Sequence, residues 1–133
     1  MSERERGSSA IELVLVTPVL VALVFAVVQA ALLWNAQHVA VAAAQQGARL
    51  ARTAAQSGAT DAQVRDATIS YLHSLGASVA DTPTVAIAHS AGWVTVTVTA
   101  RAVSVFPGAT LTVHGASRGP VETFTPDLAG GGG

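Results

Sequence analysis

Glu12 has the most unusual setting of any charged residue in this 133-residue chain. It directly precedes a run without charge, from Leu13 to Trp34. A carboxylate costs about 2.5 to 3.5 kcal/mol at the centre of a bilayer and less near its surface. Gly7 lies five residues before Glu12 and follows the charged leader 2–6. Because an unpaired carboxylate is costly in apolar surroundings, this setting predicts a specific partner for Glu12.

Other groups capable of chemistry are scattered along the chain. The histidines lie at 38, 73, 89 and 114, and none has a second ligand at helix or turn spacing. The sequence has no cysteine, no Gly-x-Ser-x-Gly nucleophile motif and no glycine-rich phosphate loop. We therefore predict no catalytic residue, no metal site and no cofactor. The seven basic residues are all arginines and face eight acids, which predicts that nucleic acid is not a partner.

The uncharged run predicts a helix that crosses the lipid bilayer. Residues 13 to 34 would form a helix about 33 Å long, and a spanning helix needs roughly 20 residues. Pro18 lacks an N–H inside this run, which predicts a kink or a local opening. The alternatives are a secretory signal cut after Ala30 and a plain signal anchor. A signal has an apolar region of about 7 to 15 residues, so the longer run favours a retained span.

The residues around this run resemble a known family. RGSSAIELVLVTPVLVALVFAVVQAALLWNAQHVAVAAAQQGARLAR, residues 6–52, is similar to the TadE-like family of pilus-assembly proteins. The shared features are Arg-Gly-Ser before the helix, Glu12 at its start, Pro18 inside it and an alanine-rich continuation to Arg52. Leu13 departs from the pattern, since many members have an aromatic residue after the glutamate.

The resemblance implies a minor pilin-like subunit of a tight-adherence pilus, cut by a prepilin peptidase between Gly7 and Ser8. The implied partners are that peptidase, other pilin-like subunits, the pilus assembly platform and the lipid bilayer. Incorporation into an extracellular pilus stays open. A cut after Gly7 would leave a free amine on Ser8. Glu12 then has two candidate partners: this amine in its own chain, four residues away, or the amine of a neighbouring subunit.

The change in composition along the chain predicts four segments. They are a cytoplasmic leader 1–7, a transmembrane and emergent helix 8–57, an exported domain 58–120 and a flexible glycine-rich tail 121–133. Arg4 and Arg6 favour an N-terminus inside the cytoplasmic membrane, which the chain would cross once. Arg49 and Arg52 oppose this orientation more weakly, because they lie about four to five helical turns beyond Trp34.

Small residues share one face of the emergent helix, namely Ala40, Ala43, Gly47, Leu50 and Ala54. They predict close packing against the protein's own sheet or, alternatively, against another subunit. Ser57–Ala59 would end this helix. Thr60–Gln63 resembles a capping box that begins a second helix. The apolar face of that helix is expected at Val64, Ala67, Tyr71 and Leu75.

Alternating residues after Asp81 predict three strands. Ser90–Gly92 is a candidate hairpin loop, and Phe106–Gly108 separates the last two strands. The apolar phase slips after Val98, which predicts a bulge or bend near 100–102. The predicted fold is α+β, with a long N-terminal transmembrane helix, a second helix and a small three-stranded antiparallel sheet. It is pilin-like in outline.

Two classes of function fit these observations. The first is a structural or assembly subunit of a pilus-like machine, without enzymatic activity. The second is a signal-anchored exported domain that binds a ligand or catalyses a reaction and is not part of a pilus. The pair Gly7 and Glu12 favours the first class, and the lack of a catalytic motif counts against an enzyme.

Overall fold

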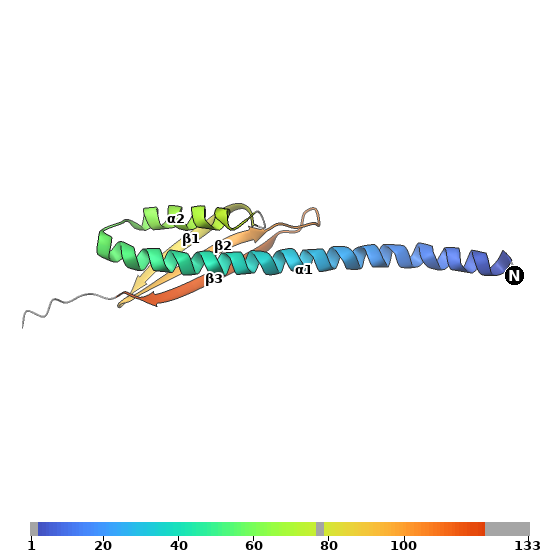
Figure 1. Ribbon diagram of the computed structural model, residues 1–133, viewed down its shortest axis with the longest axis horizontal. Coiled ribbons are helices and arrows are strands. Elements are labelled where there is room, and N and C mark those ends of the chain that lie inside the picture. The colour runs from blue at the N-terminus through green and yellow to red at the C-terminus, as the bar shows by residue number, and fades with distance from the viewer. Residues whose placement is uncertain (1–2, 77–78, 122–133) are drawn as a thin grey trace, which may run out of the picture.

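The computed structural model describes residues 3–76 and 79–121. Its elements, in chain order, are α1 (Glu3–Ser57), α2 (Asp61–Ser74), β1 (Val79–Ser90), β2 (Trp93–Ala102) and β3 (Leu111–Pro120). The strands form an antiparallel sheet in the order β1-β2-β3. The N-terminal half of α1 projects from this domain as a long rod (Figure 1). The predicted α+β fold with a long helix, a second helix and a three-stranded sheet is confirmed.

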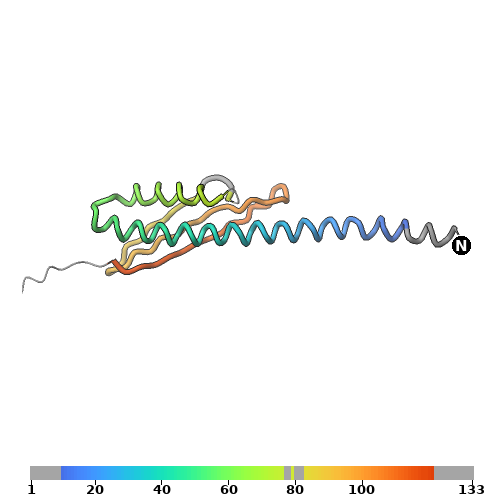
Figure 2. Tube along the Cα trace, in the orientation of Figure 1, coloured from blue at the N-terminus to red at the C-terminus, as the bar shows by residue number. Residues whose placement is uncertain are grey.

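Both helices cover the same face of the sheet. α1 packs on β2 and β3, whereas α2 packs on α1 and β1 (Figure 2). Along β2, Val94, Val96 and Val98 are fully buried, and the threonines between them are partly exposed on the opposite face. This alternation follows from the two-residue period of a strand with one covered face. The core is therefore a single layer between the helices and the sheet.

The face of α1 that meets the sheet consists of small residues. Ala40, Ala43, Gly47 and Ala54 are buried, and Leu50 is partly buried. α1 approaches β3 so closely that a Cβ on Gly115 would overlap the carbonyl of Ala40. Of the two predicted uses of this face, packing against the protein's own sheet is the one observed.

Local signals set the boundary between the helices as predicted. α1 ends at Ser57, and Gly58 follows with a φ of 76°, where its N–H donates to the carbonyl of Ala54 at 2.9 Å. The capping box of α2 is complete. The Thr60 N–H donates to Gln63 Oε1 at 2.9 Å, and the Gln63 N–H donates to Thr60 Oγ1 at 3.4 Å.

The predicted apolar face of α2 was wrong by one position. The buried residues are Val64, Thr68 and Leu72, whereas Ala67, Tyr71 and Leu75 are exposed. Thr68 can be buried because its hydroxyl donates to the Val64 carbonyl at 2.7 Å, so no polar group is left unpaired. Its small side chain fits over Gly47 of α1, where a Cβ would lie 2.8 Å from Thr68 Oγ1.

The hairpin loop between β1 and β2 is confirmed at Ala91 and Gly92. Both residues have positive φ, 24° and 78°, as a two-residue loop between twisted strands requires. Phe106–Gly108 does separate β2 from β3. Residues 122–133, where a flexible tail was predicted, lie outside the described residues. Val121 is still attached to the sheet, because its N–H donates to the Gly92 carbonyl at 2.7 Å.

The predicted bulge near 100–102 is on the other strand. β2 pairs regularly with β3 as far as Ala102. The irregularity lies in β1 between Ala80 and Thr84, where residues 81–83 stand opposite Ala100 alone. The change of apolar phase at Val103 has a different cause: β2 has already ended, and Val103 belongs to the loop that follows.

The close contact between α1 and β3 yields a stability prediction. We expect Gly115→Ala to lower the free energy of unfolding by about 3 kcal/mol, because the added methyl group meets the helix backbone and cannot be accommodated by a rotamer change. The measurement is thermal or chemical unfolding in detergent. Gly119→Ala on the same strand is the matched control, since its Cβ would meet only the flexible Arg52 side chain at 3.0 Å. Equal losses for the two variants would contradict the explanation.

Candidate functional site

The predicted processing and assembly residues lie on the projecting part of α1. Gly7, Ser8 and Glu12 belong to one continuous helix that also includes Pro18. Glu12 is exposed, and none of the described side chains forms a hydrogen bond or salt bridge with it. The helix continues through Pro18, so the predicted kink stays a prediction. The hydroxyl of Thr17 donates to the Leu13 carbonyl at 2.6 Å, which supplies a bond next to the missing proline N–H.

An uncovered apolar surface surrounds this part of α1. Large hydrophobic residues from Ile11 to Val28 are all strongly exposed. The most apolar 18-residue window of the helix has a mean hydropathy of 2.8, and none of it is buried within the protein. In water such a surface would be costly, at about 25 cal/mol per Å². Its length and composition suit a single membrane-spanning anchor.

The loop between β2 and β3 extends beyond the sheet in the direction of the N-terminus of α1, as Figure 1 shows. The Gln29 Oε1 accepts hydrogen bonds from the Val105 N–H at 2.8 Å and from the Ser104 hydroxyl at 3.2 Å. The ring of Phe106 lies against that of Phe25, with 6.4 Å between the centroids. The loop therefore contacts α1 inside the predicted membrane span.

Sequence reasoning missed this contact. It treated Phe106–Gly108 only as a break between strands, and it assigned no role to Gln29. The available signal was Gln29 itself, a polar side chain within an apolar run, since such a group needs a hydrogen-bond partner when it is removed from water. Its Nε2 is buried and has no partner among the described residues.

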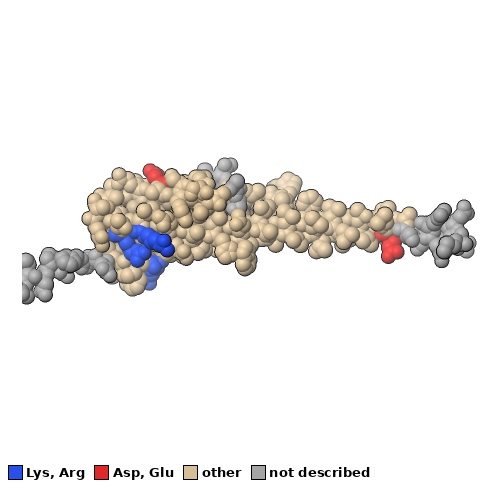
Figure 3. Space-filling model, in the orientation of Figure 1, with Lys and Arg blue, Asp and Glu red and all other residues tan. Residues whose placement is uncertain are grey.

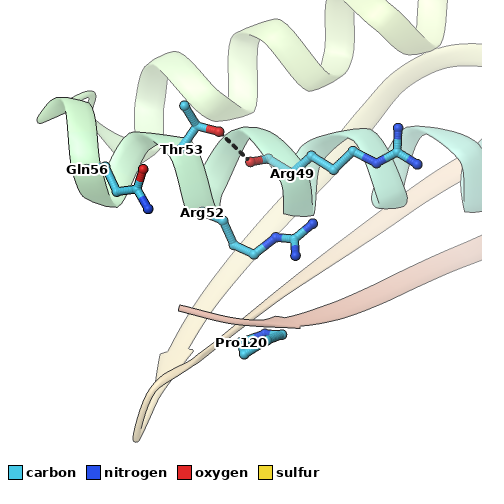
Figure 4. A pocket seen from close by; sticks show the side chains of 5 residues that line it. All are labelled: Arg49, Arg52, Thr53, Gln56 and Pro120. Carbon is cyan, nitrogen blue, oxygen red and sulfur yellow. Dashed lines mark hydrogen bonds between the residues drawn. The ribbon is translucent and has the colours of Figure 1, made fainter. Parts of the chain in front are cut away.

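A second feature lies at the opposite end of the domain. Arg49, Arg52, Thr53, Gln56 and Pro120 line a cavity of about 260 Å³ between α1 and the end of β3 (Figure 4). Arg52 points from α1 toward β3, and its Nε donates to the Ala48 carbonyl at 3.3 Å. The Thr53 hydroxyl donates to the Arg49 carbonyl at 3.1 Å. Two arginines among the lining residues give this cavity a positive charge.

Charge is distributed unevenly over the molecule. Figure 3 shows arginine side chains gathered at the end of the domain far from the N-terminus. Near that end, the Arg118 guanidinium lies 4.6 Å from the centre of the Trp93 ring. Between this end and Glu12, the projecting helix carries no charge.

The histidines are separate from one another. His89 Nε2 lies 3.1 Å from an Asp61 carboxylate oxygen, and His114 Nδ1 lies 3.1 Å from the Thr99 hydroxyl. The His38 ring is 5.1 Å from that of Trp34. Within residues 3–76 and 79–121, no three histidine, aspartate or glutamate side chains come together in a group that could hold a metal.

Comparison with known proteins bears on the N-terminal third of the chain. Residues 7–49 match the model of the TadE-like protein family, which confirms the resemblance predicted from residues 6–52. No curated protein and no solved structure matches the chain. Residues 7–49 are thus similar to TadE-like proteins, and the uncovered apolar helix in this part of the chain suits a membrane anchor. The matched residues end on α1, before α2 and the sheet begin.

The Gln29 contact gives a second prediction. In Gln29→Leu the Val105 N–H loses its acceptor, so we expect the exchange of this amide with solvent to become at least about tenfold faster. Hydrogen exchange followed by mass spectrometry or NMR measures the change. Gln37→Leu is the control, because Gln37 Nε2 donates to the His114 carbonyl at 2.8 Å and does not touch the loop. Unchanged protection of Val105 in Gln29→Leu would show that the contact does not hold the loop.

Proposed function

We propose that this protein is a minor pilin-like subunit for assembly of a tight-adherence pilus, matured by a prepilin peptidase that cuts between Gly7 and Ser8. The observation that carries the proposal is the family match, which begins at Gly7 and continues over the uncovered apolar helix. A glycine before the cut has no Cβ, which lets a protease approach the backbone closely. Gly7 lies on the projecting part of α1, far from the sheet (Figure 1).

The same proposal gives the chain a direction in the membrane. The leader 1–7 is cytoplasmic, residues 8–57 span the membrane and emerge from it, and the domain 58–120 is outside. Because α1 is one continuous helix from Glu3 to Ser57, anchor and domain form a single piece. A subunit that enters a pilus must therefore leave the bilayer together with its domain. Pro18 supplies the point in the span where the helix opens or bends during that step.

Glu12 is the proposed assembly residue. Its carboxylate is exposed next to apolar surface and unpaired among the described residues, and an unpaired charge there is costly. Cleavage after Gly7 creates a positive amine on Ser8. We propose that Glu12 pairs with the Ser8 amine of a neighbouring subunit. This ion pair would form only when the subunits align in one register. The competing account is a bond to the amine of its own chain.

The processing step is tested at Gly7. In cells that contain the cognate peptidase, Gly7→Val should retain the leader, because a branched side chain blocks access to the scissile bond. Intact mass and N-terminal sequencing distinguish the products. The control Ala10→Val places the same valine side chain inside the mature helix and should be cut normally. A wild-type product that begins at Ser8 supports the proposal, whereas one beginning at Ala31 identifies a secretory signal and an intact N-terminus identifies a plain anchor.

The assembly role is tested at Glu12. Glu12→Gln keeps the size of the side chain and removes its charge, so membrane insertion and cleavage should persist. Association with other pilin-like subunits should fall by at least about tenfold, since removing one partner of a desolvated ion pair costs about 3 to 5 kcal/mol. Co-purification from native membranes measures this. Thr17→Val, which alters a side chain bonded only within its own helix, is the control. Wild-type recovery of the glutamine variant would favour the local account.

A further inference from the structure

The loop between β2 and β3 contacts α1 at residues that would lie within the bilayer. Glu12 limits one end of the span, because its carboxylate favours the interfacial region. A hydrocarbon core of about 30 Å needs roughly 20 helical residues, so a span that starts at Leu13 ends near Leu33. On this scale Gln29 lies about 6 Å and Phe25 about 12 Å inside the boundary on the domain's side. The loop contacts both residues.

The tip of this loop is chemically suited to lipid. Its residues are Val105, Phe106 and Pro107, all apolar, and Phe106 is 45% exposed. None of the three has a free backbone N–H: that of Val105 donates to Gln29, that of Phe106 donates to the Ser104 hydroxyl at 3.1 Å, and proline has none. Unpaired N–H and C=O groups exclude irregular chain segments from hydrocarbon, and no unpaired N–H remains at Val105, Phe106 or Pro107.

The carbonyl at the tip is also paired. The Phe106 carbonyl accepts from the Ala109 N–H at 3.2 Å and from the Ser104 hydroxyl at 3.2 Å. The Ser104 hydroxyl has one hydrogen, which is shared between this carbonyl and Gln29 Oε1, while its oxygen accepts from the Phe106 N–H. These bonds leave the Phe106 ring as the outward-facing part of the tip. The Phe106 ring packs on Phe25 of the membrane span, so lipid would contact the exposed part of the ring.

Trp34 marks the boundary of the span on the domain's side. It lies one residue beyond the expected end of the span and is 71% exposed. Tryptophan is enriched where hydrocarbon meets the headgroups, since its ring is apolar and its N–H is polar. Trp34 therefore marks where the helix leaves the hydrocarbon, and Phe25, which Phe106 contacts, lies about 13 Å further along the helix toward the middle of the span.

We propose that Val105–Pro107 is a second membrane contact, inserted into the acyl region of the leaflet on the domain's side. The Gln29 contact holds it at that depth. The domain is then fixed at two points, the helix and the loop tip, which sets its distance from the membrane and its rotation about α1. This inference rests on α1 being a bilayer span, as in the proposed function, and adds a site outside the residues that the family match covers.

Tryptophan fluorescence in vesicles tests the depth of the tip. The natural tryptophans are Trp34 and Trp93, so single-tryptophan proteins are readily made. The test protein is the full chain with W34F, W93F and F106W, placed in vesicles of phosphatidylcholine and phosphatidylglycerol that carry bromine near the headgroup or near the chain ends. We expect about twofold quenching of F106W, at least as strong with bromine near the chain ends as with bromine near the headgroup, because its ring lies against Phe25 deep in the leaflet.

Two controls separate the possible failures. W34F retains Trp93, at the hairpin far from the membrane, and should not be quenched by either lipid. W34F with W93F and L20W places the reporter in the middle of the span, where bromine near the chain ends should quench it most. F106W that behaves like Trp93 while L20W is quenched overturns the loop contact and leaves the anchor intact. An unquenched L20W overturns the anchor itself.

A second measurement avoids the larger tryptophan ring. The chain has no cysteine, so Phe106→Cys can carry a polarity-sensitive fluorophore, with Gln56→Cys as the exposed control on the distal end of α1. A blue-shifted emission at 106 and not at 56 supports insertion. Equal emission at the two positions overturns it. A shift that appears only when the protein is crowded in the vesicles, and vanishes on dilution with lipid, would show that a second copy of the chain covers the tip, which also overturns the assignment.

Discussion

The close approach of α1 to the sheet is the contact on which the rest of the structure depends. It is possible because Ala40 faces Gly115 and because alanines occupy most of the buried positions on that side of the helix. Small residues contribute little apolar area each, but they let the two backbones pack with few voids. The valines of β2 supply the volume that the helix lacks. A larger residue on either side would separate the layers and expose this core.

Because of this contact, the two halves of α1 have different surroundings. Up to about Val28 the surface of α1 is uncovered and apolar on all sides, as a lipid-facing helix requires. From Ala36 onward only one face is apolar, and it is covered by the sheet. No turn or cap separates the two regimes, so bending the anchor relative to the domain would mean breaking helical hydrogen bonds. The domain's position therefore follows the helix closely, and any hinge has to lie within the span.

Sequence reasoning succeeded where the cause is local. Three features depend on neighbours within about five residues: the capping box at Thr60, the glycine after α1 and the two-residue hairpin. The long helix could be predicted from its composition. It failed where tertiary contacts decide. Thr68 is buried because Gly47 of another helix makes room for it, and the loop contact joins Gln29 to Val105 across 76 residues. The bulge was assigned to β2 because the change of apolar phase after Val98 was taken for an irregularity within the strand, whereas β2 ends at Ala102 and the bulge lies in β1.

Gln29 and Glu12 are polar side chains on the apolar part of α1, and they find their hydrogen-bond or ionic partners in different ways. Gln29 lies near the domain, and its carbonyl oxygen accepts two hydrogen bonds from the loop that folds back over it. Glu12 lies some 17 residues earlier, about 25 Å along the helix, where no part of the described domain can reach. The same requirement for a partner applies to both, and it is stronger for a charged group. The fold meets the requirement of the Gln29 carbonyl oxygen with the chain's own loop, whereas Gln29 Nε2 has no partner among the described residues. For Glu12 the remaining sources of a partner are the N-terminal residues beside it and other molecules, so the described domain does not depend on its charge for folding.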